Sequence, residues 1–160
     1  MLKTERLTIR KIDIADADFI RTLVNTQGWL KFIGDRKVND IESAQKFIKT
    51  WALDRYKNYD YGPYLILFNE TPIGVNGLFQ RDYLNHPDLG FAFLPEYSGK
   101  NYAYESSLAI IKYARTLNLY NLGGITTSNN RASKRLLEKL GFQMKEHQLK
   151  EVDLYYELGL

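Results

Sequence analysis

The sequence predicts an α/β (α+β) fold: a mixed, mostly antiparallel central sheet of about six to seven strands with helices on both faces. β-prone stretches and stretches of helical periodicity share the chain in the order β-α-α-β-β-β-α-β-α-β-β. Three successive strands in the middle favour antiparallel pairing, because short connections can join them. A β-α-β unit over residues 88–127 then predicts two parallel strands with a right-handed crossover.

The first elements are one strand and two helices. Residues 6–12 alternate loosely between apolar and polar side chains and are β-prone. Residues 13–25 carry apolar side chains at helical spacing. The same spacing recurs over residues 39–56, where Asn39 or Asp40 can cap a second helix. The segment between the two helices is interpreted as a loop or a helical turn.

The middle and the end of the chain supply the other strands. Residues 64–68 and 73–79 flank the turn "NETP" and predict a β-hairpin. A loop over residues 81–87 leads to a third strand at 88–94, which Pro95 ends. The elements that follow are a helix at 103–117, a short strand at 122–127, a helix at 130–141, and two closing strands at 142–150 and 152–158.

Composition indicates a single domain spanning residues 1–160. The 22 basic and 19 acidic residues give a net charge of +3, which is too small and too evenly spread to indicate nucleic-acid binding. Cysteine is absent and there are two histidines, so we expect no disulfide, thiol nucleophile or metal site. The chain has no apolar run long enough to span a membrane and its start lacks an apolar signal-peptide core, which favours a cytoplasmic protein without a membrane partner.

Residues 96–107, "EYSGKNYAYESS", mark the entry into a long amphipathic helix. A helix start leaves backbone N–H groups unpaired and carries partial positive charge. Gly99, Asn101 and Ala103 leave those donors accessible, and Lys100 adds a charge, so the pattern suits a phosphate. A plain turn with a helix cap explains the same residues equally well.

A second polar helix start lies within residues 128–142, with Ser133 one turn after Asn130. Taken alone, this pattern indicates ordinary capping by Asn129 or Asn130, with Ser133 as a solvated helix residue.

Together the two segments resemble the GNAT superfamily of acyl-CoA N-acyltransferases, and nearly the whole chain follows its element order. The stretch "LPEYSGKNYAYES" is similar to the pattern L-P-E-Y-W-G-K-G-Y-A-T-E of the branch that contains the ribosomal-protein N-terminal acetyltransferases. The later signature, Asn-x-x-Ser followed by Glu-Lys-Leu-Gly-Phe, is met at Asn130, Ser133 and residues 138–142. The family's pyrophosphate loop, Gln/Arg-x-x-Gly-x-Gly/Ala, maps onto Ser98, Gly99, Lys100, Asn101, Tyr102 and Ala103.

The chain departs from that family pattern at three positions. Asn101 replaces the central loop glycine, and asparagine tolerates a positive φ better than most residues. Ser98 replaces the Gln/Arg, and Leu137 replaces a tyrosine that serves many relatives as general acid.

The resemblance implies an N-acetyltransferase that uses acetyl-CoA as co-substrate. The acceptor would be a primary amine, either a protein N-terminal α-amine or a small-molecule amine, that attacks the thioester directly in a ternary complex. Residues 88–94 would form a splayed strand along which acyl-CoA binds. Backbone groups of Phe93 and Leu94, together with Asn130, would hold the pantetheine arm. The pyrophosphate would bind the loop and helix start made of Ser98, Gly99, Lys100, Asn101, Tyr102, Ala103 and Tyr104.

The same resemblance implies the catalytic candidates. With Leu137 at the tyrosine position, Ser133 is the candidate for stabilising the leaving thiolate. Asp88 is the candidate base, with His86 as the alternative, although both residues also suit a solvated loop. A site without a strong base suits an α-amine, with a pKa of about 8, better than a lysine, with a pKa of about 10.4. The residues expected to line the acceptor channel, or else simply the edge of the core, are Trp29, Phe32, Tyr83 and His86.

Two other functions stay open at this point. The chain could be a catalytically weak CoA-binding module of the same fold, with Asn101 and Leu137 as marks of decay. A nucleic-acid-binding domain ranks last, because the basic residues alternate with acidic ones, as in "KRLLEK", instead of clustering beside aromatic residues. The sequence does not decide between a monomer and a homodimer.

Overall fold

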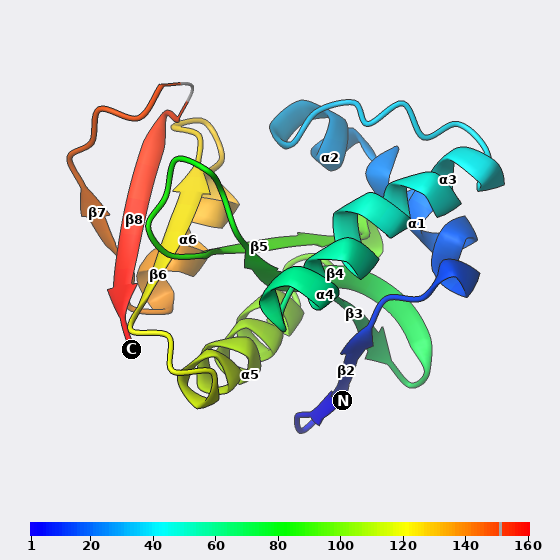
Figure 1. Ribbon diagram of the computed structural model, residues 1–160, viewed down its shortest axis with the longest axis horizontal. Coiled ribbons are helices and arrows are strands. Elements are labelled where there is room, and N and C mark those ends of the chain that lie inside the picture. Colours follow the sequence, from blue (N-terminus) through cyan, green and yellow to red (C-terminus); the bar gives the residue numbers. More distant parts are fainter. Residues whose placement is uncertain (151) are drawn as a thin grey trace.

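The chain forms one eight-stranded sheet in the computed structural model, which describes residues 1–150 and 152–160 (Figure 1). The strands are β1 (Leu2–Lys3), β2 (Leu7–Lys11), β3 (Pro63–Phe68), β4 (Thr71–Phe79), β5 (Asp88–Phe93), β6 (Asn121–Thr126), β7 (Gln143–Lys145) and β8 (Leu154–Gly159). They lie in the order β1-β2-β3-β4-β5-β6-β8-β7, and only β5 and β6 are parallel. The predicted class, a mixed and mostly antiparallel sheet, is confirmed.

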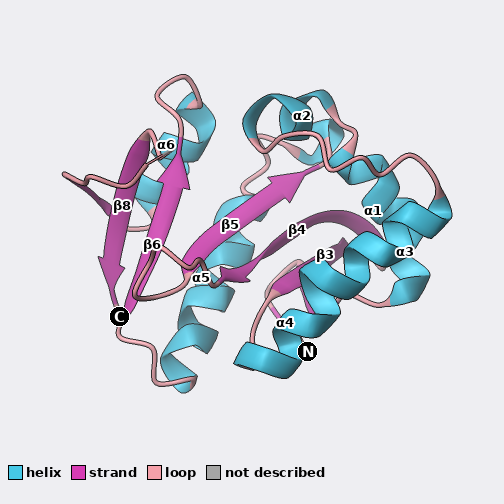
Figure 2. Cartoon of the chain, turned by 45° about the horizontal axis from the view of Figure 1, so that its top comes forward, coloured by secondary structure: helices cyan, strands magenta, loops and turns pink. Residues whose placement is uncertain are grey.

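The helices are α1 (Ala17–Val24), α2 (Gln27–Phe32), α3 (Ile41–Ile48), α4 (Asp54–Tyr59), α5 (Tyr102–Thr116) and α6 (Arg131–Lys139). Short 3-10 turns at Ile14–Asp16 and Pro95–Tyr97 and a π-helical turn at Lys49–Leu53 complete them. Helices cover both faces, with α3 and α4 in front of β3 and β4 in Figure 2 and α5 behind β4 and β5. Within the described residues, no helix has the length and apolar character that crossing a bilayer requires.

Side chains of β4 show which helix covers which face. Phe79 stacks on Trp51 of the π-helical turn, with ring centroids 6.0 Å apart. Asn76 points to the other face, where its amide nitrogen donates to the hydroxyls of Ser106 and Ser107 on α5 at 2.9 and 2.8 Å. Because alternate residues of a strand face opposite sides, the odd-numbered β4 residues between Gly74 and Phe79 face α1–α4 and the even-numbered ones face α5.

Two helical predictions are refined by the structure. The helix predicted over residues 39–56 is one continuous helical stretch, capped by Asp40, whose carboxylate accepts from the Ser43 N–H at 2.7 Å. Its central turn is π-helical, which apolar spacing alone does not indicate. The segment interpreted as a loop or helical turn contains α2, which Thr26 caps.

The number of strands exceeds the six to seven predicted because the two residues of β1 pair with β2, with Leu2 opposite Ile9. The strand predicted over residues 142–150 is shorter than expected and is only β7. Beyond β7 the chain leaves the sheet edge, and Leu149 packs in a small second cluster of side chains, Leu84, Val152 and Tyr155.

The sheet opens between its two parallel strands. Strands β5 and β6 are in register at one pair only, Asp88 opposite Gly123, supported by a hydrogen bond of 2.9 Å from the Gly123 N–H to the Pro87 carbonyl. A side chain at Gly123 would crowd the Tyr155 ring at 3.2 Å and would meet Asp88 at an ordinary contact distance of 3.5 Å, so glycine leaves room for Tyr155 at this junction. Past this pair the strands diverge, and the edge of β5 that faces β6 has no strand partner within the described residues.

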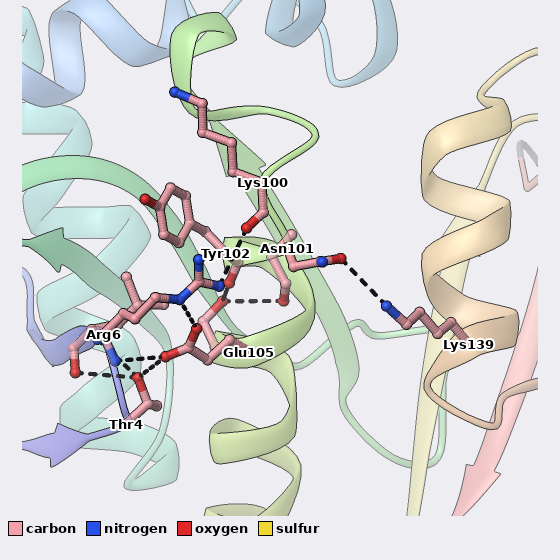
Figure 3. A network of polar contacts seen from close by, with 10 residues as sticks. Thr4, Arg6, Lys100, Asn101, Tyr102, Glu105 and Lys139 are labelled. Atoms are coloured by element: carbon pink, nitrogen blue, oxygen red, sulfur yellow. Dashed lines mark hydrogen bonds and ion pairs between the residues drawn. The ribbon is translucent and has the colours of Figure 1, made fainter.

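The start of α5 is anchored to the N-terminal segment by charge (Figure 3). The Glu105 carboxylate accepts from the Thr4 hydroxyl at 2.5 Å, from the Arg6 N–H at 2.9 Å and from Arg6 Nε at 2.7 Å. The same guanidinium donates to the Lys100 carbonyl at 3.2 Å and lies 4.5 Å from the centre of the Tyr102 ring. The first turn of α5 therefore has a fixed place beside β2.

Replacing Glu105 by Gln is expected to lower the free energy of unfolding at neutral pH by about 1 kcal/mol. Burial alone would raise the pKa of the Glu105 carboxyl, but the bonds from Thr4 and Arg6 lower it. A carboxylate with a lowered pKa stabilises the fold above its unfolded-state pKa and loses that effect as the pH falls through its folded-state pKa.

The deficit of the Glu105→Gln variant should therefore shrink in acid, which urea unfolding between neutral pH and about pH 3 measures. Glu96→Gln, at an exposed carboxylate in the preceding turn, is the control and should change little. A deficit of Glu105→Gln that is independent of pH would contradict the charge-based anchor.

Candidate active site

A groove of about 1820 Å³ occupies the opening between β5 and β6. One wall is β5 with the loop and the first turn of α5 that follow it. The opposite wall is the end of β6 and the inner face of α6. The groove continues across the sheet to a second region bounded by α2, the π-helical turn, α4 and the loops at residues 81–83 and 148–150.

The loop before α5 presents a run of free backbone donors to this groove. Gly99 and Asn101 both have a positive φ, at 73° and 65°. Asn101 is the N-cap of α5 but its side chain makes no capping bond. Within the described residues, no backbone N–H from Gly99 to Tyr104 has an acceptor, whereas the Ser98 N–H donates to the Pro95 carbonyl at 3.1 Å. An anion is the natural acceptor for such a run at the positive end of a helix.

Positive side chains stand beside the same donors. Lys139 of α6 reaches across the opening, where its ammonium lies 3.3 Å from Asn101 Oδ1 and 4.1 Å from the centre of the Tyr104 ring. Figure 3 shows this contact joining the two walls of the groove. Lys100 extends from the loop, with its ammonium 5.6 Å from the centre of the Tyr97 ring.

Phe93 and Leu94, whose backbone groups were expected to hold a pantetheine arm, differ in whether those groups are free to bind a ligand. Phe93 lines the groove at the end of β5. The Leu94 N–H donates to the Ile73 carbonyl at 2.9 Å, and the Leu94 carbonyl accepts from the Tyr97 N–H at 3.0 Å. The unpaired edge of β5 therefore ends at Phe93, and Leu94 is committed to its own strand end.

Asn130 and Ser133 both line the wall formed by α6. Asn130 also caps that helix, because its Oδ1 accepts from the Ser133 N–H at 3.2 Å. Leu137, one turn further, is buried and lies over Gly124, where an added side chain would approach it to 2.8 Å. Leu137 therefore packs against β6 at the position where many GNAT relatives have a tyrosine. The hydroxyl closest to this position along the chain is that of Ser133.

Asp88 lies at the point where β5 and β6 meet. Its carboxylate is buried, with 2% of the residue exposed, and accepts from Arg81 Nε at 2.8 Å and Nη2 at 3.3 Å. Burial raises the pKa of the Asp88 carboxyl, and the Arg81 guanidinium opposes this rise. Asp88 pairs in register with Phe79, so its side chain faces α1–α4, on the second region of the groove.

His86 lies apart from the groove lining, against β8. Its Nε2 is 3.3 Å from Glu157 Oε1 and 3.1 Å from the Tyr155 hydroxyl, while its Nδ1 is buried without a partner among the described residues. The Tyr155 hydroxyl donates to Glu157 at 2.9 Å. This cluster supports the β5–β6 junction from the side.

The other expected acceptor residues, Trp29, Phe32 and Tyr83, do line the second region. The buried Trp29 Nε1 has no partner within the described residues. Sequence reasoning missed Arg55 and Arg81, which stand in the same region. A signal for Arg81 existed, since it and Asp88 flank one short loop with opposite charges, whereas Arg55 arrives from a helix distant in sequence. No cluster of metal-ligating side chains occurs among the residues described.

Comparison with known proteins decides the family. Residues 6–143 match the family described as Acetyltransferase (GNAT) domain. The chain belongs to the GNAT family. A relative from Bacillus subtilis (strain 168), "Uncharacterized N-acetyltransferase YoaA", is 29% identical over 151 residues, which cover 89% of this chain and 82% of that protein.

Solved structures share the GNAT fold. The acetyltransferase from Agrobacterium tumefaciens str. C58 has a TM-score of 0.83 at 24% identity and covers 98% of this chain and 92% of its own. RimL, a ribosomal L7/L12 α-N-protein acetyltransferase solved in complex with coenzyme A, has a TM-score of 0.84 at 18% identity and covers 98% and 96%. At these identities the likeness concerns the fold.

The loop geometry of this GNAT chain depends on Asn101 accepting a left-handed backbone. Asn101→Val should lower the free energy of unfolding by about 1–2 kcal/mol, because a β-branched residue resists a positive φ. Asn101→Gly should cost less, since glycine adopts that conformation freely and only the contact with Lys139 is lost. Urea unfolding of both variants measures this, and equal stability of the Val and Gly variants would show that the conformation imposes no strain.

Proposed function

We propose that this chain transfers the acetyl group of acetyl-CoA to a primary amine, a protein N-terminal α-amine or a small-molecule amine, by direct attack in a ternary complex. The observation that carries the proposal is that an unpaired strand edge and a run of unpaired N–H donors open onto one groove. Backbone amides that lack acceptors fit a pyrophosphate, and a free strand edge fits the amide groups of a pantetheine arm.

Each wall of the groove has a role in this proposal. The N–H groups from Gly99 to Tyr104 bind the pyrophosphate, and Lys139, which lines the groove, and Lys100, which belongs to the loop, add positive charge. The edge of β5 up to Phe93 binds the pantetheine arm, and Asn130 contacts it from α6. The thioester then lies toward the β5–β6 junction, where backbone donors of β5 polarise its carbonyl.

Asp88 and Ser133 take the proton-handling roles. Asp88 accepts a proton from the ammonium of the acceptor, which leaves the neutral amine that attacks, and Arg81 orients the Asp88 carboxylate. Ser133 stabilises the thiolate as it leaves, directly or through a water. The neutral amine attacks the thioester carbon, the carbon–sulfur bond breaks, and the nitrogen of the new amide gives up a proton that the departing CoA thiolate takes up. An α-amine suits a site with one shielded carboxylate, because much of it is already neutral near pH 8.

Cofactor binding is tested by a matched pair of substitutions at Gly99. Gly99→Asp places a negative charge beside the donors and should raise the Kd for CoA by about tenfold or more, because like charges repel. Gly99→Asn has almost the same shape and also tolerates the positive φ, so it should change the Kd much less. Calorimetry with CoA measures both, and equal Kd values for Asp and Asn would remove this loop from the site.

Catalysis is tested by CoA release from acetyl-CoA with a panel of amines and peptides. Ser133→Ala should lower kcat by about tenfold while leaving CoA affinity unchanged, since the thiolate charge develops only as the bond breaks. Asp88→Asn should lower the rate most at low pH, and its defect should shrink as the pH rises and the amine deprotonates unaided.

Two outcomes of this assay count against the roles assigned. A Ser133→Ala variant with full kcat at every pH would make Ser133 an ordinary helix residue. A protein that binds CoA tightly yet releases none of it from acetyl-CoA with any amine would be a CoA-binding module instead of an enzyme.

A further inference from the structure

The second region of the groove carries more positive charge than its own carboxylates neutralise. Arg36, Arg55, Arg81 and Lys150 line it, and Asp88 is the one acidic residue among the described residues of the lining. Asp88 is already paired with Arg81. The arginines therefore leave a net positive charge facing a space that is partly shielded from water.

Of the two half-buried arginines of this region, Arg55 and Arg81, Arg55 has more of its donors free. Its Nη1 donates to the Gln80 carbonyl at 3.1 Å, and its Nε is buried with no acceptor among the described residues. Neither Arg55 nor Arg36 forms an ion pair with a described acidic residue, whereas Arg81 does. A guanidinium has five donors arranged to meet a carboxylate at two points, so most of the capacity of Arg55 is open.

The ring of Phe79 lies against both Arg55 and Arg81, and so keeps the two guanidiniums near one another and near Asp88. Both guanidiniums lie over the Phe79 ring, at 5.7 and 5.8 Å from its centre. Phe79 pairs in register with Asp88, and the charge of Arg55 acts on the Asp88 carboxyl. Trp51 stacks on the same ring at 6.0 Å, so apolar surface limits the access of water to the charges.

These arginines lie far from the donors proposed for pyrophosphate. Asp88 begins β5 and Phe93 ends it, and five strand steps separate them by about 17 Å. The loop with Gly99 lies beyond Phe93. A negative charge bound by Arg55 therefore belongs to the acceptor and is distinct from the phosphates of CoA.

We infer that the acceptor amine carries a carboxylate a few bonds from its nitrogen, and that Arg55 binds this carboxylate while Asp88 faces the amine. The inference rests on the proposed function and narrows its substrate class to anionic amines. The carboxylate has two sources with the same chemistry: the main-chain carboxylate of a free amino acid, or an acidic side chain near the N-terminus of a peptide.

The test compares amines that differ by one charge and hardly at all in shape. Alanine against alaninamide and serine against serinamide test the main-chain carboxylate of a free amino acid, and the peptides Ser-Asp-Ala-Ala against Ser-Asn-Ala-Ala, both amidated at the C-terminus, test the side-chain source. CoA release from acetyl-CoA should give a kcat/KM about 10- to 100-fold higher for the acid member of the accepted pair, chiefly through KM. The pair that shows the difference identifies the source.

Variants attribute the preference to Arg55. Arg55→Gln should abolish the preference for the acid member, and Arg55→Lys should keep part of it because the charge remains. Arg115→Gln, at an exposed arginine on the last turn of α5, is the control and should keep the whole preference. Equal kcat/KM for acid and amide members, or a preference that survives in Arg55→Gln, would overturn the inference while leaving the acetyltransferase proposal intact.

Binding separates the two proposals if no amine is acetylated. Calorimetry with CoA-saturated protein and the two peptides should then show tighter binding of Ser-Asp-Ala-Ala to the wild type, with the difference lost in Arg55→Gln. That result would retain the anionic subsite and refute acetyl transfer. The absence of any difference between the two peptides would refute the subsite as well.

Discussion

A single strand pair fixes the geometry of this molecule. Asp88 and Gly123 are the one residue pair in register between the parallel strands β5 and β6. Beyond this pair the two strands diverge, so the sheet is open between them. The free edge of β5, the groove and the separation of its two walls all follow from that junction. Glycine at 123 leaves room there for the Tyr155 ring, which a side chain would approach to 3.2 Å. The same aspartate begins β5 and places its carboxylate in the second region of the groove.

The donors at the start of α5 would be of little use unless their position were fixed in advance. Glu105 ties the first turn to the N-terminal segment, and Asn76 ties the next turn to the centre of the sheet through Ser106 and Ser107. The backbone at Gly99 and Asn101 turns in the left-handed region, which frees the N–H groups from local partners. The reorganisation needed on binding a phosphate is therefore small, which favours affinity.

Features that depend on neighbouring residues in the chain, such as strand ends, helix caps and positions with a positive φ, could be predicted from the sequence. Pro95 ends β5, Asn130 caps α6, and Asn101 occupies a position where its tolerance of positive φ is used. Contacts between residues far apart in the chain could not be predicted from the sequence. The entry of Arg55 into the second region of the groove depends on how α4 packs over β4, and the placement of His86 against Glu157 depends on the pairing of β6 with β8. Neither leaves a periodic or spaced signal in the chain.

Amide hydrogen exchange of residues 99–104, with and without CoA, tests the central claim most directly. These N–H groups have no acceptor among the described residues, so they should exchange quickly in the free protein and slowly once a pyrophosphate accepts from them. Amides in the middle of α5 provide the internal reference, since they are bonded in both states. Exchange at 99–104 that stays fast in protein saturated with CoA would place the phosphates elsewhere and contradict the account.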